Sequence, residues 1–162
     1  MNLFKGLAAG ALAGVAASYV MERFQAEWNK AEEKGGGQGG SDDEEDPSTI
    51  KAADRVALAA TGHPVPSRYR DAAGELVHYT TGAGVGAVYG ALSEIAPVLT
   101  FGFGAAYGTA VAVGLDDTLV PRLGLAKGPK ETPPSEHAYS LASHLVYGLT
   151  LEGVRRVIRA VL

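Results

Sequence analysis

The sequence predicts an all-α protein: an integral membrane bundle of four glycine-rich transmembrane helices with one short amphipathic helix. Two observations lead to this class. Four stretches without a charged residue each approach the length that crosses a bilayer, and they cover residues 6–21, 76–93, 95–115 and 137–151. Within them small residues recur at every fourth position, which forms a groove along a helix and lets two membrane helices pack closely.

The charge distribution supports the same class. The 162-residue chain has a net charge of -4, and most of its charged residues lie in a polar insert and in short patches beside the apolar stretches. A soluble bundle would instead carry charges along one face of each helix. The excess of acids argues against nucleic acid as a partner, and the lipid bilayer is the expected surrounding. The absence of cysteine excludes disulfides and thiolate metal sites.

Residues 1–22 are expected to form the first transmembrane helix. Gly6, Gly10, Gly14 and Ser18 are spaced four apart, as in a packing face between membrane helices. A lysine followed by an apolar run is also typical of a signal peptide, but no clear cleavage site follows. Whether this segment is retained after export is left open.

Residues 23–71 are expected to form a polar insert. It begins as a charged continuation of the first helix, with Phe24 and Trp28 four residues apart at the membrane interface. Residues 35–47 form a flexible linker of glycines and acids, whose role the sequence does not indicate. Residues 49–61 then place their apolar side chains on one helical face, which predicts an amphipathic helix on the membrane surface or against the bundle.

Residues 72–162 are expected to form a three-helix transmembrane region. The second helix of the bundle is predicted at about 72–96 and the third at about 97–119. Only a tight turn at Pro97 separates them, which makes them an antiparallel hairpin. The last helix is predicted to begin near Ser135, which would serve as its N-cap.

Small residues of the four helices form ladders, and the next rung at the C-terminal end of each ladder is an acid. The glycines expected to pack helices together are Gly6, Gly10, Gly14, Gly82, Gly86, Gly90, Gly104, Gly108 and Gly148. The acids are Glu22, Glu94, Asp116 and Glu152. An acid at that end opposes the helix dipole, so helix stability does not explain it. One interpretation is that these acids only mark where the membrane ends.

A second interpretation follows from the topology of four spans. Glu22, His78 and Asp116 then gather on one side, together with Asp117, Glu136 and His137. Glu94 and Glu152 lie on the other side, and His144 lies between. Ionisable groups inside a membrane bundle usually pair or carry protons, so we expect a functional polar ridge. Its members are His78, His144, Glu22, Glu94, Asp116, Glu152 and Arg155. The alternative is that both histidines only fasten helices together by hydrogen bonds.

No cofactor is expected, although two arrangements are open. His78 and His144 are suitable axial ligands for a b-type haem held between helices. The same pair with a carboxylate is a suitable ligand set for zinc or iron. The sequence contains no phosphate-binding glycine loop, nucleophile elbow or zinc-protease motif, and a non-enzymatic protein is expected.

The C-terminal run SEHAYSLASHLVYGLTLEGVRRVIR, with Ser143-His144, Glu152 and Arg155-Arg156, resembles the C-terminal segment of the YagU-like bacterial inner-membrane proteins, a domain family of unknown function. His78 in HYTTGAGVGAVYG is similar to the corresponding part of that family. The acidic glycine linker departs from the family pattern. The resemblance implies a multi-pass protein of the bacterial cytoplasmic membrane, and a link to acid tolerance without a known mechanism.

The function expected from these features is that of a small multi-pass membrane protein that responds to pH or passes protons or small solutes. The alternative is a structural protein that packs through its glycine ladders, with a second copy or another membrane protein as partner. A haem- or metal-binding membrane subunit is the third reading. Orientation is left open, because basic residues favour the first and third connections in the cytoplasm while Arg155, Arg156 and Arg159 favour the opposite.

Overall fold

The computed structural model describes residues 2–34 and 46–162, and the regular elements of these residues are all helical. This confirms the all-α class. The four longest helices are α1 (Leu3–Lys34), α2 (Ser48–Thr61), α3 (Arg70–Ile95) and α6 (Pro134–Val161), and a short 3-10 turn, η1 (Ser67–Tyr69), leads into α3. Helix α6 begins at Pro134 with Pro133 as its N-cap, two residues before the expected N-cap at Ser135. The predicted linker at 35–47 lies outside the described residues except for Asp46 and Pro47.

The segment predicted as one helix over 97–119 is broken, so that prediction is wrong. It begins as a 3-10 segment, η2 (Pro97–Gly104), in which Gly102, Phe103 and Gly104 have positive φ angles of 69°, 54° and 84°. Glycine adopts such angles at little cost, so the ladder glycine Gly104, together with Gly102, permits the break. The chain continues as α4 (Ala105–Val111), a π-helical turn η3 (Ala112–Leu119) and α5 (Val120–Arg122).

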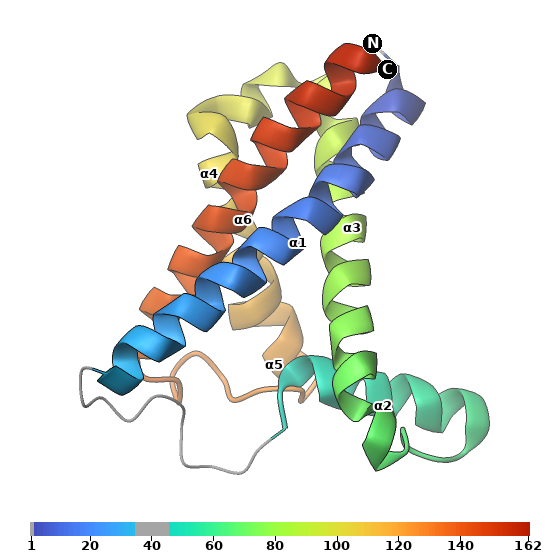
Figure 1. Cartoon of the computed structure of the whole chain (residues 1–162), viewed down its shortest axis with the longest axis vertical. Helices are drawn as coiled ribbons and strands as arrows, with labels where there is room; N and C mark the ends of the chain where they lie inside the picture. The colour runs from blue at the N-terminus through green and yellow to red at the C-terminus, as the bar shows by residue number, and fades with distance from the viewer. Residues whose placement is uncertain (1, 35–45) are drawn as a thin grey trace.

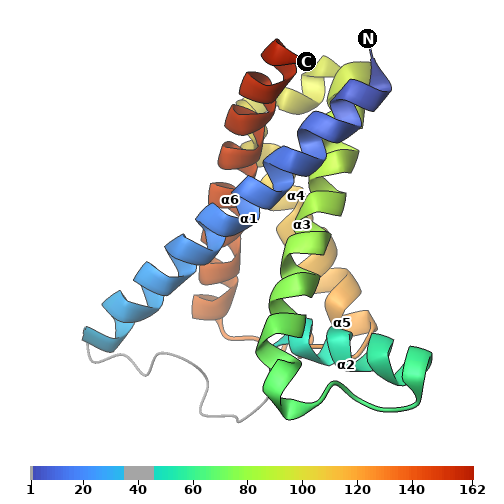
Figure 2. The ribbon, with the colours of Figure 1, turned by 45° about the vertical axis from the view of Figure 1, so that its right-hand side comes forward.

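The helices are arranged as two antiparallel pairs, α1 with α3 and α4 with α6 (Figures 1 and 2). Both described ends of the chain lie at the same end of the bundle, and α2 lies across the opposite end (Figure 1). Helix α1 also packs on α6, which joins the two pairs. The bundle therefore has a termini end and an α2 end.

Glycines bring the backbones of each pair into direct contact. Gly6, Gly10 and Gly14 of α1 face Gly90, Gly86 and Gly82 of α3. A Cβ atom on Gly86 would overlap the carbonyl oxygen of Gly10 and lie 2.8 Å from the Cα atom of Gly14. In the second pair, Gly104 and Gly108 face Gly148 in the same way. No residue larger than glycine fits these positions without moving a helix.

The two pairs resemble each other in sequence as well as in packing. Val88-Tyr89-Gly90 is followed by Glu94, and Val146-Tyr147-Gly148 is followed at the same spacing by Glu152. Gly90 packs on Gly6 with Glu94 beside it, and Gly148 packs on Gly104 with Glu152 beside it. The bundle is thus built from two similar helix pairs, which the ladders alone did not predict.

The interior holds many small and polar residues beside a few large ones, and most large apolar side chains lie outside. The largest fully buried side chains of the described residues are those of Tyr89, Leu151, Glu152, Ser18 and Ser143. By contrast, Phe4, Val98 and Phe101 are each at least 75% exposed. A protein that folds in water buries its large apolar side chains first, so this distribution is the reverse of the usual one.

Two segments of the described chain are long and apolar enough to cross a membrane, Leu3–Lys34 and Pro97–Arg122. Four were predicted, and α3 and α6 do not meet the same test of length and composition. The reason is their content of glycine, serine, threonine, tyrosine and histidine, which lowers their hydropathy while providing the packing and polar contacts of the interior.

Glycine contacts of this kind predict opposite outcomes for two neighbouring substitutions on α3. Gly86→Ala should lower the free energy of unfolding by about 1 to 3 kcal/mol, because the methyl group collides with the α1 backbone. Gly84→Ala should leave it unchanged or raise it by up to about 1 kcal/mol, since a Cβ there meets no atom within 4 Å. Unfolding by dodecyl sulfate in mixed micelles, followed by circular dichroism, measures both values. Equal effects of the two substitutions would contradict the packing described.

Candidate functional site

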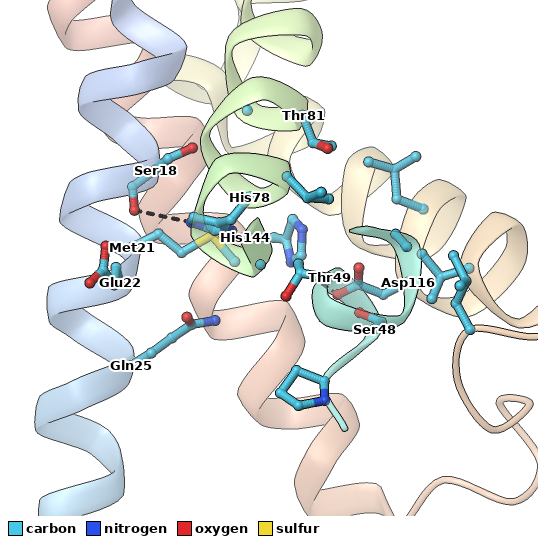
Figure 3. Close-up of a pocket in the computed structure, with 18 of the residues that line it drawn as sticks. Ser18, Met21, Glu22, Gln25, Ser48, Thr49, His78, Thr81, Asp116 and His144 are labelled. Atoms are coloured by element: carbon cyan, nitrogen blue, oxygen red, sulfur yellow. Dashed lines mark hydrogen bonds and ion pairs between the residues drawn. The ribbon is translucent and has the colours of Figure 1, made fainter. Parts of the chain in front are cut away.

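A cavity of about 930 Å³ lies at the α2 end of the bundle. Its walls come from α1, α2, α3, η3 and α6, so residues far apart in sequence meet there. Figure 3 shows His78 and His144 between Glu22 on one side and Asp116 on the other. The polar groups that line it are Ser18, Glu22, Gln25, Ser48, Thr49, Asp71, Glu75, His78, Thr81, Asp116, Glu136, Tyr139, His144 and Tyr147.

His78 occupies the wall between α1 and α3. Its Nε2 atom lies 3.4 Å from the carbonyl oxygen of Ser18. The imidazole ring lies edge-on to Tyr79, with ring centres 5.5 Å apart, and the Tyr79 hydroxyl donates a 2.5 Å hydrogen bond to Glu22. The histidine and the carboxylate predicted on this side are therefore linked through one tyrosine.

His144 occupies the opposite wall, between α6 and η3. Its Nδ1 atom lies 3.0 Å from the carbonyl oxygen of Ser140 and 3.5 Å from a carboxylate oxygen of Asp116. The Ser140 hydroxyl donates a 2.6 Å hydrogen bond to the same carboxylate oxygen. Because a carbonyl oxygen only accepts, Nδ1 carries the proton, and Nε2 of the neutral ring is left as an acceptor. The residue is only 8% exposed.

The cavity therefore brings together Glu22, His78, Asp116 and His144 of the predicted polar ridge. Glu136 lines it as well, while Asp117 and His137 pair beside it at 3.2 Å. The contributions of α2 and of Tyr139 did not emerge from sequence reasoning. An aromatic partner for Trp28 could have been expected from its place in the interface stretch of α1. Tyr139 is that partner, with ring centres 5.9 Å apart.

Helix α2 is held against the cavity by polar contacts and one apolar contact. Arg55 donates to the carbonyl oxygens of Leu123 and Gly124, the latter at 3.1 Å. Arg70 pairs with Asp46 at 2.6 Å and with Asp54 at 2.7 Å, and these hydrogen bonds raise its pKa. The Ile50 side chain lies over Gly74 of α3, where a Cβ atom would meet it at 2.8 Å. These contacts place Ser48 and Thr49 at the cavity.

The remaining members of the predicted ridge lie at the termini end and do not join the cavity. Glu152 is fully buried and accepts hydrogen bonds from Arg155 at 2.7 Å, Arg156 at 2.6 Å and the Tyr89 hydroxyl at 3.0 Å. Glu94 pairs with Arg159 at 2.6 Å and accepts the backbone N–H of Asn2 at 2.8 Å. Guanidinium groups therefore neutralise both acids at this end, which is the condition for burying a carboxylate.

The described residues contain no group of three histidine, aspartate or glutamate side chains that could hold a metal ion. Residues 2–34 and 46–162 therefore do not bring both histidines and a carboxylate together as a ligand set for zinc or iron. Both histidines have a ring nitrogen beside a backbone carbonyl oxygen, at Ser18 and Ser140. Haem binding stays a prediction.

The fold and the cavity define a class: a protein whose described elements are all helical, with two segments long and apolar enough to cross a membrane and a cavity of acids and histidines at one end. The model of the family described as "Protein of unknown function (DUF1440)" matches residues 54–153, which is more than half of the 162-residue chain. The chain belongs to this family. The matched region includes His78, Asp116 and His144, but not Glu22 or Arg155. Comparison with curated proteins and with solved structures finds no match.

The Glu94–Arg159 pair predicts a loss of stability when its carboxylate is removed. Glu94 pairs with Arg159 at 2.6 Å and accepts the Asn2 N–H at 2.8 Å. Glu94→Gln takes the negative charge from both donors and should lower the free energy of unfolding by about 1 to 3 kcal/mol. Unfolding by dodecyl sulfate in mixed micelles measures this value, with Glu27→Gln of the exposed Glu27–Lys30 pair as the control. Equal effects of the two substitutions would contradict the pairing.

Proposed function

We propose that the chain is a multi-pass membrane protein in which α1, α3, the segment from α4 to η3, and α6 each cross the bilayer. The observation that carries this proposal is the reversed distribution of side chains, with glycine, serine and Glu152 inside and phenylalanine, valine and leucine outside. Lipid is the medium in which that distribution is stable, since apolar side chains gain little there by burial. Helices α3 and α6 qualify through their length, 26 and 28 residues, and their buried polar faces.

The basic residues favour one orientation. Of the fourteen lysines and arginines, only Lys5, Arg155, Arg156 and Arg159 lie at the termini end, and the others lie at the α2 end or its connections. Cytoplasmic connections carry the excess of lysine and arginine. We therefore place the α2 end and its cavity in the cytoplasm, and the resemblance to YagU-like proteins supports a bacterial cytoplasmic membrane.

An orientation of this kind is tested by cysteine labelling, because the chain has no cysteine of its own. Gly128→Cys introduces a thiol in the connection at the α2 end, and Leu162→Cys introduces one at the termini end. In intact cells a membrane-impermeant maleimide should label Leu162→Cys alone, and Gly128→Cys should react only after permeabilisation. Labelling of both from the same side would exclude an odd number of crossings between them.

The function that the cavity supports best is a pH-responsive site for a small solute or for protons, without catalysis. Histidine is the side chain that changes charge near neutral pH. The groups around His78 and His144 are Glu22 on α1, Glu75 and Tyr79 on α3, Asp116 and Asp117 on η3, and Glu136 and Tyr139 on α6, with Ser48 and Thr49 on α2. A proton on either histidine therefore adds positive charge among carboxylates and draws the walls together.

A row of tyrosines supports passage from the cavity toward the termini end. Tyr147 lines the cavity and donates a 2.7 Å hydrogen bond to the carbonyl oxygen of Gly82. Tyr107 and Tyr89 follow with ring centres 4.6 Å apart, and Tyr89 donates to Glu152. Phenol hydroxyls thus lie between the two polar ends of the bundle and offer hydrogen-bond partners to a proton. An interior of aliphatic side chains would offer none.

A structural role is the second candidate, and the histidine contacts favour it. Both rings lie beside carbonyl oxygens of the helix backbone, an arrangement that also serves a histidine whose only task is to hold helices. The glycine ladders are occupied within the chain, so this role concerns the bundle itself rather than a second copy. The two candidates differ in whether the cavity changes with pH.

The single tryptophan provides the measurement that separates them. Trp28 contacts Tyr139 of the cavity wall, so its fluorescence reports on that wall. In lipid nanodiscs the emission of the wild type should change between pH 8 and pH 5, and His78→Gln with His144→Gln should abolish the change. His63→Gln is the matched control, because His63 lies in an exposed loop away from the cavity. A transition that survives both cavity substitutions would favour the structural role.

A further inference from the structure

We propose that the cavity binds an organic cation, with an ammonium group against its carboxylates and an apolar body against its walls. This inference rests on the proposed function, since it concerns the same cavity. Five carboxylates line it, those of Glu22, Asp71, Glu75, Asp116 and Glu136, and the described lining residues include neither a lysine nor an arginine.

The carboxylates on the two walls are satisfied differently from the acids at the other end of the bundle. Glu22 accepts from the Tyr79 hydroxyl and Asp116 from the Ser140 hydroxyl, both neutral donors, and Asp116 also lies 3.5 Å from Nδ1 of His144, which carries no charge in the neutral ring. Glu94 and Glu152, in contrast, meet arginine side chains. A neutral donor leaves the negative charge of the carboxylate in place, so the cavity retains a charge that a bound cation would balance.

The rest of the lining specifies an organic cation rather than a metal ion. Val85, Val111 and Leu115 provide apolar wall, and Tyr139 and Tyr147 add aromatic rings. An ammonium group over an aromatic ring gains roughly 0.5 to 2 kcal/mol. A metal ion would need three converging ligands, which the described residues do not supply. A primary or quaternary ammonium with an apolar body fits both parts of the lining.

Two sources present this chemistry to a cytoplasmic cavity at the membrane surface. One is a soluble amine, and the other is the head group of an aminophospholipid. Both offer the same ammonium group, and the cavity reaches the level of the head groups in the proposed orientation. The lipid composition of the membrane therefore distinguishes them.

The test is equilibrium binding of radiolabelled benzyltrimethylammonium to the full chain in nanodiscs of phosphatidylglycerol. Binding should saturate, and benzenesulfonate of similar size should not compete. Glu22→Gln and Asp116→Asn, on opposite walls, should each raise the Kd at least tenfold. Glu27→Gln is the matched control on α1, because Glu27 pairs with Lys30 on the surface and does not line the cavity. Its Kd should equal that of the wild type.

Nanodiscs that also contain phosphatidylethanolamine identify the source. A weaker apparent affinity there assigns the site to the lipid head group, and an unchanged affinity assigns it to a soluble amine. Absence of saturable binding, competition by benzenesulfonate, or equal Kd values for Glu22→Gln, Asp116→Asn and wild type would overturn the proposal. If the Trp28 pH transition persists in that case, only the ligand class fails, whereas loss of both would refute the proposed function as well.

Discussion

Direct contact between helix backbones is the constraint on which the rest of this bundle depends. Where Gly10 meets Gly86 and Gly108 meets Gly148, no side chain separates the helices. Close approach of two backbones maximises van der Waals contact without requiring apolar side chains between them. Valine, leucine and phenylalanine side chains are then free to lie on the outer surface, and the interior is left to small and polar groups.

That arrangement separates the polar groups into two kinds. At the termini end Glu94 and Glu152 meet arginines, and the charges cancel within the bundle. In the cavity at the α2 end Glu22 and Asp116 meet hydroxyls, and Asp116 also lies 3.5 Å from the His144 ring, so neither carboxylate meets an arginine among the described contacts. The first arrangement is typical of structural ion pairs, and the second is typical of a site that binds a cation. The proposal that the cavity binds a cation follows from this difference rather than from any single residue.

The sequence was sufficient to predict the all-α class and to place Glu22, His78 and Asp116 at one end of the bundle, because helical spacing and the alternating direction of successive helices lead to both. It was insufficient where the local backbone departs from regular helix. Gly104 was predicted as a ladder position, yet its positive φ angle and those of Gly102 and Phe103 before it break the third helix. Arg155, Arg156 and Arg159 read as an orientation signal, but their pairing with Glu152 and Glu94 depends on contacts between helices that spacing does not encode.

The second helix pair differs from the first at one informative position. Gly10 packs on Gly86, and its counterpart Gly108 packs on His144. The glycines common to both helix pairs hold the helices together, whereas the second pair has His144 at the position that corresponds to Gly86 in the first. A substitution of the His144 side chain therefore need not weaken the glycine contacts that hold α1 against α3.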